Sequence, residues 1–161
     1  MDTFDVEFLE ANNPVTGALT DYVKFLLNGV DFLDISHNYE LPFMIAEGRP
    51  QPIDKQRFWR YRWGAADSLL GKDQYDGSEE GEEQGKSLIL GCKCGFDDDW
   101  PLYARIIISK HTVTWKDFEN PFRAQGSRMG VWSYEALGPF VFDKKSYMKA
   151  VDKFYLPYRI T

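Results

Sequence analysis

Cysteine and histidine are scarce in this sequence. The 161 residues include two cysteines and two histidines, and Cys92 and Cys94 are separated by a single residue. A disulfide between positions i and i+2 closes a small, strained ring and links no distant elements, which excludes the disulfide framework of small secreted domains. We therefore expect free thiols in a reducing compartment.

Long apolar runs are missing as well. No stretch approaches the roughly 20 consecutive apolar residues that span a bilayer as a helix. The N-terminal residues MDTFDVEFLE carry acids where a secretory signal peptide carries a basic region. We expect a cytoplasmic protein without a membrane partner.

The sequence also lacks the short motifs of common catalytic sites. It contains no G-x-S-x-G, no G-x-x-x-x-G-K-[ST] and no H-E-x-x-H segment. The aspartates that follow Cys94 disfavour the thiolate form in which cysteine acts as a nucleophile. The sequence thus predicts no catalytic residue and favours a protein that is not an enzyme.

The length and composition that are present indicate one domain. A chain of 161 residues with 43% hydrophobic and 27% charged residues is long enough for one core and short for two. We therefore predict a single domain over residues 1–161. Aromatic residues reach 16%, which indicates a bulky core or an adhesive surface.

The net charge of −6 belongs to one segment. Residues 73–84, DQYDGSEEGEEQ, hold six acids and no base, and the rest of the chain has 19 acids and 19 bases. Such a segment cannot bury enough apolar surface to order itself, so we predict a flexible acidic loop over residues 72–86. The loop is either simply solvated or a docking segment for a basic partner.

Hydrophobic periodicity predicts strands both before and after the acidic loop in the sequence. Strands are indicated by the alternation in residues 3–10, by the apolar residues before Asn28 and by the β-branched residues in 103–109. Further strands are predicted over 86–94 and 112–118. Asp31 and Asp143 are placed to cap two helices, and Pro42 is expected to kink or restart the first. The fold class is therefore predicted to be α+β, with a mainly antiparallel sheet and helices packed on one face.

A metal site is one open interpretation of the Cys-x-Cys segment. Residues i and i+2 of a strand point to the same side, so Cys92 and Cys94 could bind one ion, with His111 or Asp99 approaching across the turn. Zinc is the metal that such ligands would hold. Because free cysteines are also common in protein cores, a core-lining role is the competing interpretation, and it predicts no cofactor.

A basic and aromatic segment indicates a second alternative, the binding of single-stranded nucleic acid. Residues 55–63 interleave Arg57, Arg60 and Arg62 with aromatic residues that include Trp59. This composition is typical of surfaces that combine phosphate contacts with base stacking. The chain as a whole is acidic, with a sequence pI near 4.9, and this charge disfavours nucleic-acid binding.

Three further segments resemble a known family. The residues GCKCG at 91–95, WPL at 100–102 and VTWKDFENPFR at 113–123 are similar to a family of small uncharacterised bacterial proteins with a G-C-x-C-G, C-W-P-L and V-x-W-x-x-F-x-x-P-H-R pattern. The resemblance extends over most of the chain and implies one domain. Asp99 stands where that family often has a third cysteine and Phe122 where it has a histidine, so the resemblance implies fewer soft metal ligands here.

These observations favour a non-enzymatic protein-binding domain, of the kind that an immunity or antitoxin-like inhibitor provides. Its partner would be another protein, with basic surface, while the sequence leaves the oligomeric state open. The binding residues would be acidic and aromatic, as in many interfaces with strong electrostatic steering. The predicted set is Glu79, Glu80, Glu82, Glu83, Asp97, Asp98, Asp99 and Trp100.

Overall fold

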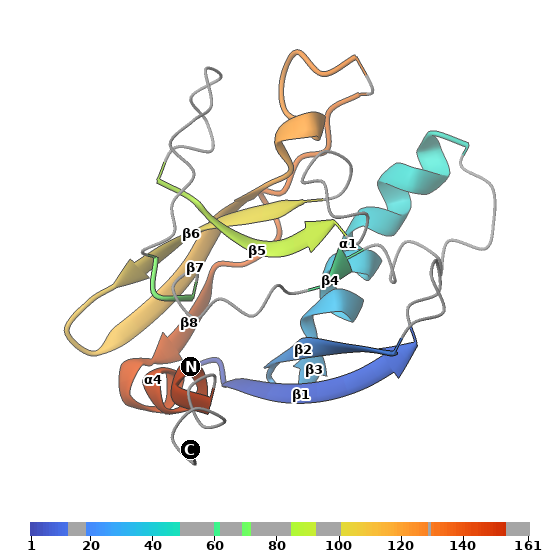
Figure 1. Cartoon of the computed structure of the whole chain (residues 1–161). Coiled ribbons are helices and arrows are strands. Elements are labelled where there is room, and N and C mark those ends of the chain that lie inside the picture. Colours follow the sequence, from blue (N-terminus) through green and yellow to red (C-terminus); the bar gives the residue numbers. More distant parts are fainter. Residues whose placement is uncertain are drawn as a thin grey trace.

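The protein has an α+β fold built on antiparallel strands, as the sequence predicts. The computed structural model describes residues 1–12, 19–48, 60–61, 69–71, 85–92, 101–128 and 130–153. The strands form two sheets, with orders β1-β2-β3 and β4-β5-β6-β7-β8, instead of the one sheet expected. One helix packs on the first sheet and the other contacts both, and the two sheets enclose the core between them (Figure 1).

The first sheet is a meander of three strands. Its strands are β1 (Phe4–Asn12), β2 (Leu19–Leu27) and β3 (Val30–Asp31). Asn28 and Gly29 join β2 to β3 with φ angles of 54° and 78°, which are the left-handed angles that a two-residue hairpin turn requires. The Asn-Gly dipeptide satisfies this requirement because both residue types tolerate positive φ.

Helix α1 (Phe32–Ala46) follows directly on the first sheet. The Asp31 carboxylate accepts a hydrogen bond of 2.9 Å from the Leu33 amide, which confirms the predicted cap. The helix does not restart at Pro42, because α1 continues through this residue to Ala46. Contacts made beyond Pro42, including the fully buried Met44, override the local preference.

The second sheet holds the strongest strand pattern of the sequence. Its strands are β4 (Arg60–Tyr61), β5 (Ser87–Cys92), β6 (Leu102–Ile108), β7 (Thr112–Glu119) and β8 (Phe140–Asp143). Strands β4 and β8 lie where no strand is predicted. A short 3-10 helix, η1 (Pro121–Arg123), and a long connection lead from β7 to β8, and helix α4 (Lys144–Asp152) ends the described chain.

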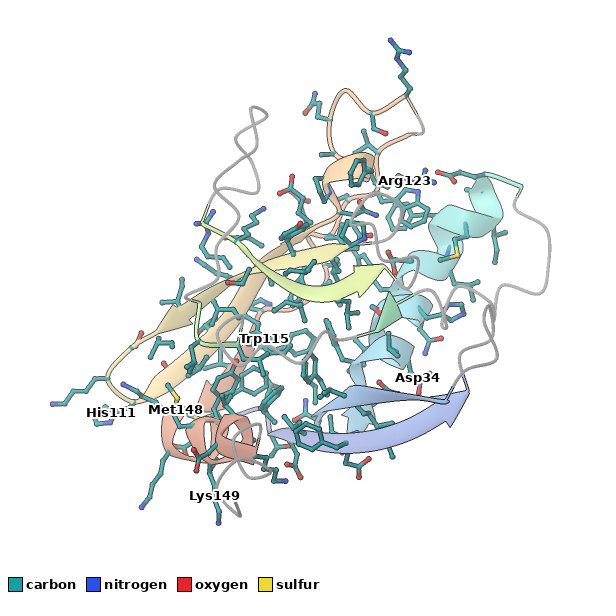
Figure 2. The ribbon with its side chains drawn as sticks, viewed as in Figure 1. Asp34, His111, Trp115, Arg123, Met148 and Lys149 are labelled. Carbon is teal, nitrogen blue, oxygen red and sulfur yellow. The ribbon has the colours of Figure 1, made fainter. Side chains whose placement is uncertain are left out.

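Trp115 lies at the centre of the core (Figure 2). Its ring is fully buried and meets five other aromatic rings edge to face, with centroids 5.3 to 6.3 Å away. The five rings belong to β1, β2, α1, β8 and α4: Phe4, Phe25, Phe32, Phe142 and Tyr147. Much of the aromatic surplus therefore serves to pack both sheets and both helices around one residue.

Asp2 joins the two sheets at their edges. One of its carboxylate oxygens accepts a hydrogen bond of 2.8 Å from the Val141 amide in β8, and the other accepts one of 2.9 Å from the Asn28 side chain in the β2–β3 turn. These bonds stabilise the ionised form and hold the pKa of Asp2 below its ordinary value of 3.8. The Asp143 carboxylate, which caps α4 through the Ser146 amide, also has a lowered pKa.

We expect acid to weaken the joint between the sheets. Because the folded pKa of Asp2 lies below the unfolded value of 3.8, its contribution is present above the unfolded pKa and is lost as the pH falls through the lower folded value. Urea unfolding of wild type and Asp2→Asn should therefore show a larger stability difference at pH 6 than at pH 3. An equal difference at both pH values would contradict this role of the carboxylate.

Candidate functional site

Most of the residues that the sequence nominates for binding lie outside the described part of the chain. This holds for the two acidic segments, for one cysteine and for most of the basic and aromatic segment. They are Glu79, Glu80, Glu82, Glu83, Asp97, Asp98, Asp99, Trp100, Cys94, Arg57, Trp59 and Arg62. The roles predicted for them stay predictions, as does the acidic loop.

The structure separates two members of the predicted metal site. Cys92 ends β5, next to the start of β6, whereas His111 lies in the turn at the far end of β6 (Figures 1 and 2). The seven residues of β6 lie between these ends, a distance of roughly 20 Å at ~3.4 Å per residue. The backbone therefore places these two residues at opposite ends of β6, and the metal site predicted for Cys92, Cys94 and His111 stays a prediction.

The described residues bear on the other predicted sites and on membrane insertion. Within the described ranges, no group of three or more His, Cys, Asp or Glu side chains is placed to hold a metal ion. Arg60 lies in β4 and pairs with Cys92 of β5, so at this point the basic and aromatic segment is extended. No helix in the described residues has the length and apolar content needed to cross a membrane.

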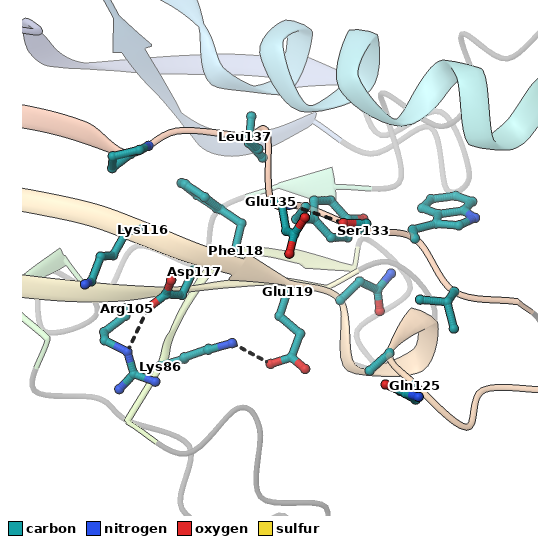
Figure 3. Close-up of a pocket in the computed structure, with 16 residues that line it drawn as sticks. Lys86, Arg105, Lys116, Asp117, Phe118, Glu119, Gln125, Ser133, Glu135 and Leu137 are labelled. Atoms are coloured by element: carbon teal, nitrogen blue, oxygen red, sulfur yellow. Dashed lines mark hydrogen bonds and ion pairs between the residues drawn. The ribbon is translucent and has the colours of Figure 1, made fainter.

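The described residues do form a groove on the second sheet (Figure 3). It has a volume of about 580 Å³ and lies between the end of β7 and the connection that leads to β8. Two walls can be distinguished, one made by strands and one by the connection. The lining residues are Lys86, Arg105, residues 116–120, Ala124, Gln125, residues 131–135, Leu137 and Pro139.

The strand wall of the groove includes an open edge of β7. Strand β8 pairs with the first half of β7 only, from Thr112 to Trp115. The position that would face Lys116 is Pro139, which has no amide hydrogen and cannot continue the ladder. Among the described residues, 116–119 therefore pair with β6 on one side and with no strand on the other.

A bulge shapes this open half of β7. Lys116 faces Arg105 and Glu119 faces Tyr103, so Asp117 and Phe118 together oppose a single residue of β6. Asp117 has a φ of 53°, a conformation that glycine, asparagine and aspartate tolerate better than other residues do. Its carboxylate meets the Arg105 side chain at 3.2 Å, but both side chains are well exposed, so this ion pair stabilises the bulge little.

We expect the stability of Asp117 variants to depend on whether the new residue tolerates positive φ, and not on the loss of the charge. Asp117→Val should lower the free energy of unfolding by about 1–2 kcal/mol, because a β-branched side chain tolerates positive φ poorly. Asp117→Gly and Asp117→Asn should be close to neutral, although both also remove the ion pair. Urea unfolding measures all three, and equal losses would show that the ion pair, not the angle, is decisive.

The opposite wall is irregular chain that α1 holds in place. The Tyr39 hydroxyl donates to the Ser133 carbonyl at 2.6 Å, and the Tyr134 hydroxyl donates to the buried Glu40 carboxylate at 2.6 Å. The Tyr39 and Tyr134 rings are stacked with centroids 5.6 Å apart. This wall is therefore preformed, because its side chains are fixed to a helix on the side away from the groove.

Arg123 anchors the same wall at its other end. Its guanidinium is almost completely buried, meets the Glu47 carboxylate at 2.5 Å and lies over the Trp132 ring at 4.3 Å. The Trp132 indole donates to the same Glu47 oxygen at 2.7 Å. Three side chains from α1's end, η1 and the connection thus form one network, in which Arg123 and Trp132 are buried and Glu47 is partly exposed.

The charges of the groove are only partly paired internally. Lys86 and Glu119 form an ion pair of 2.8 Å with little exposure, and Arg105 is paired with Asp117. Within the described ranges, Lys116, which lies directly across from Arg105, has no carboxylate partner. Glu135 has no cationic partner in the same ranges. Figure 3 shows Lys116 on the strand wall and Glu135 reaching from the connection toward β7.

Asn120 contributes a free donor to the groove. Its side-chain oxygen accepts from the Phe122 amide at 3.0 Å and caps η1, which fixes the orientation of the amide group. Its side-chain nitrogen is buried and has no hydrogen-bond partner among the described residues. Unpaired buried donors are rare because each costs about 1–3 kcal/mol, so an acceptor that reached this nitrogen after a small movement of the wall would remove that cost.

The segment 113–123, which carries part of the family resemblance, contributes to this groove. Six residues of the segment 113–123, which carries the family resemblance, belong to the strand wall or to its anchor: Lys116, Asp117, Phe118, Glu119, Asn120 and Arg123. Comparison with protein-family models, with curated proteins and with solved structures found no match. The family resemblance therefore stays a prediction.

Proposed function

We propose that this protein is a non-enzymatic domain that binds another protein through the groove beside β7. The observation that carries the proposal is the combination of an open strand edge with a preformed wall that includes Trp132 and Tyr134. Open strand edges are ready to pair with another chain, and a preformed wall beside the edge lowers the cost of ordering on binding. Val131, 54% exposed, adds an apolar contact at the rim.

The sequence supports a finer version of this proposal, an inhibitor of the immunity or antitoxin kind that acts on a basic partner. The support is the acidity confined to residues 73–84 and the triplet at 97–99. Such charges raise the association rate with a basic partner more than they raise the affinity. Changing Glu79, Glu80, Glu82 and Glu83 to glutamine should slow association at low salt and leave dissociation unchanged.

The groove itself is tested by a pair of matched substitutions. Val131 lines the groove, whereas Val30 in β3 is similarly exposed, at 47%, and does not line it. We expect one partner protein to copurify from the native cells with both wild type and Val30→Arg. The purified partner should bind Val131→Arg at least tenfold more weakly than it binds wild type. A partner that binds all three forms equally would remove the groove from the proposal, and the absence of any partner would remove the function.

A further inference from the structure

The open half of β7 has the requirements of a strand-addition site. Residues 116–119 have a neighbouring strand on one side only, within the described structure, and they line the groove. A peptide that binds in this way gains its affinity from main-chain hydrogen bonds and its specificity from alternate side chains. The edge is short, so side-chain contacts have to supply the specificity.

Asn120 extends the row of donors just beyond β7. The residue lines the groove, and its unpaired side-chain nitrogen lies buried just beneath the groove surface, oriented by the bond that its oxygen makes with Phe122. An amide nitrogen in this state requires an acceptor, and the main-chain carbonyl of an added strand is one. A ligand that supplies this oxygen removes the cost of leaving the donor unpaired.

The charges select among extended peptides. Lys86 and Arg105 are already paired with Glu119 and Asp117, so their charges are compensated. Lys116 is the strand-wall cation without a carboxylate partner in the described ranges, and it lies directly across from Arg105. Like charges opposite each other on a sheet are destabilising, so a carboxylate from a ligand relieves this arrangement.

We propose that the groove binds an extended segment of the partner protein, which adds as a strand to residues 116–119 of β7, fills the Asn120 donor with a main-chain carbonyl and places an Asp or Glu side chain on Lys116. This inference rests on the proposed protein-binding function and specifies the local chemistry of the segment. A basic surface elsewhere on the partner, facing the acidic residues of this chain, is compatible with an acidic residue at this one position.

A random twelve-residue peptide display library, selected against the full chain, provides the probe. We expect enriched peptides to carry Asp or Glu at one position within an otherwise β-prone sequence. In fluorescence anisotropy, a synthetic consensus peptide should bind Lys116→Met about tenfold more weakly than wild type. Lys149→Met, which removes an exposed lysine of α4 outside the groove, should bind normally.

Two further variants isolate the individual contacts. Asn120→Asp keeps the oxygen that caps η1 but replaces the donor with an acceptor, so it should also weaken binding about tenfold while thermal unfolding shows a folded protein. Lys116→Glu should prefer a peptide in which Lys replaces the acidic residue. On binding of the consensus peptide, amide hydrogen exchange should slow in residues 116–119.

Several results would overturn the inference. These are an enriched set without an acidic position, unchanged affinity in both Lys116→Met and Asn120→Asp, or no added amide protection in residues 116–119. If the Val131-dependent partner is found and yet no such peptide binds, the strand-addition inference fails and the proposed function stands. If the peptide binds as described and no partner protein exists, the proposed function fails instead.

Discussion

Trp115→Ala should lower the free energy of unfolding by about 4 kcal/mol, because replacing a buried aromatic residue with alanine costs 3–5 kcal/mol. The residue is fully buried and meets rings from both sheets and both helices, so the cavity cannot be closed by the movement of one element. Urea unfolding of wild type and variant at neutral pH measures this loss. A loss below 2 kcal/mol would show that the core collapses around the cavity.

Two smaller changes separate packing from hydrogen bonding at this position. The Trp115 indole donates to the Tyr147 hydroxyl at 3.0 Å, and that hydroxyl donates to the Leu69 carbonyl at 2.6 Å. Tyr147→Phe removes the hydroxyl that the Trp115 indole and the Leu69 carbonyl share, and it should lower the free energy of unfolding by about 1–3 kcal/mol. Trp115→Phe keeps a ring in the core and should cost about 2 kcal/mol, clearly less than alanine.

Arg123→Met should be the second most destabilising change, with an expected loss of about 3 kcal/mol. The substitution removes a buried charge that is paired with Glu47 and stacked on Trp132. The Glu47 carboxylate keeps the indole donor but loses its cation. Urea unfolding measures the loss, and the consensus peptide should bind more weakly to this variant, because Trp132 lines the groove.

Arg123→Lys and Glu47→Gln serve as controls for the network. Lysine keeps the charge but not the planar group that lies over Trp132, so we expect most of the loss to remain. Glu47→Gln keeps an oxygen for the indole and removes the charge. If the loss in the double variant Arg123→Met, Glu47→Gln equals the sum of the two single losses, the ion pair contributes nothing.

The local structure is well predicted because its signals are local. Asp31 and Asp143 cap the helices because their carboxylates reach amides two or three residues further along the chain. Asn28 and Gly29 form the turn because both tolerate positive φ. The strand over residues 103–109 is confirmed in β6 by the β-branched residues that form it.

The candidate site could not be predicted in the same way, because long-range contacts build it. The groove depends on Tyr39 and Glu40 of α1, which reach the connection about 94 residues further along the chain. The length of β6 separates Cys92 from His111, although their spacing in the sequence suggested proximity. Strand β8 was missed because its four residues have no clear alternation and depend on β7 for pairing.

The shared oxygen of Glu47 has a consequence for how the groove can open. One atom at the end of α1 accepts from both Arg123 and Trp132, so the irregular wall and the helix end are joined at a single point. Further bonds from Tyr39 and Glu40 join them again along the helix. The wall therefore belongs to the cooperative unit of the helix, and its fluctuations should have the amplitude of a helix and not of a surface loop.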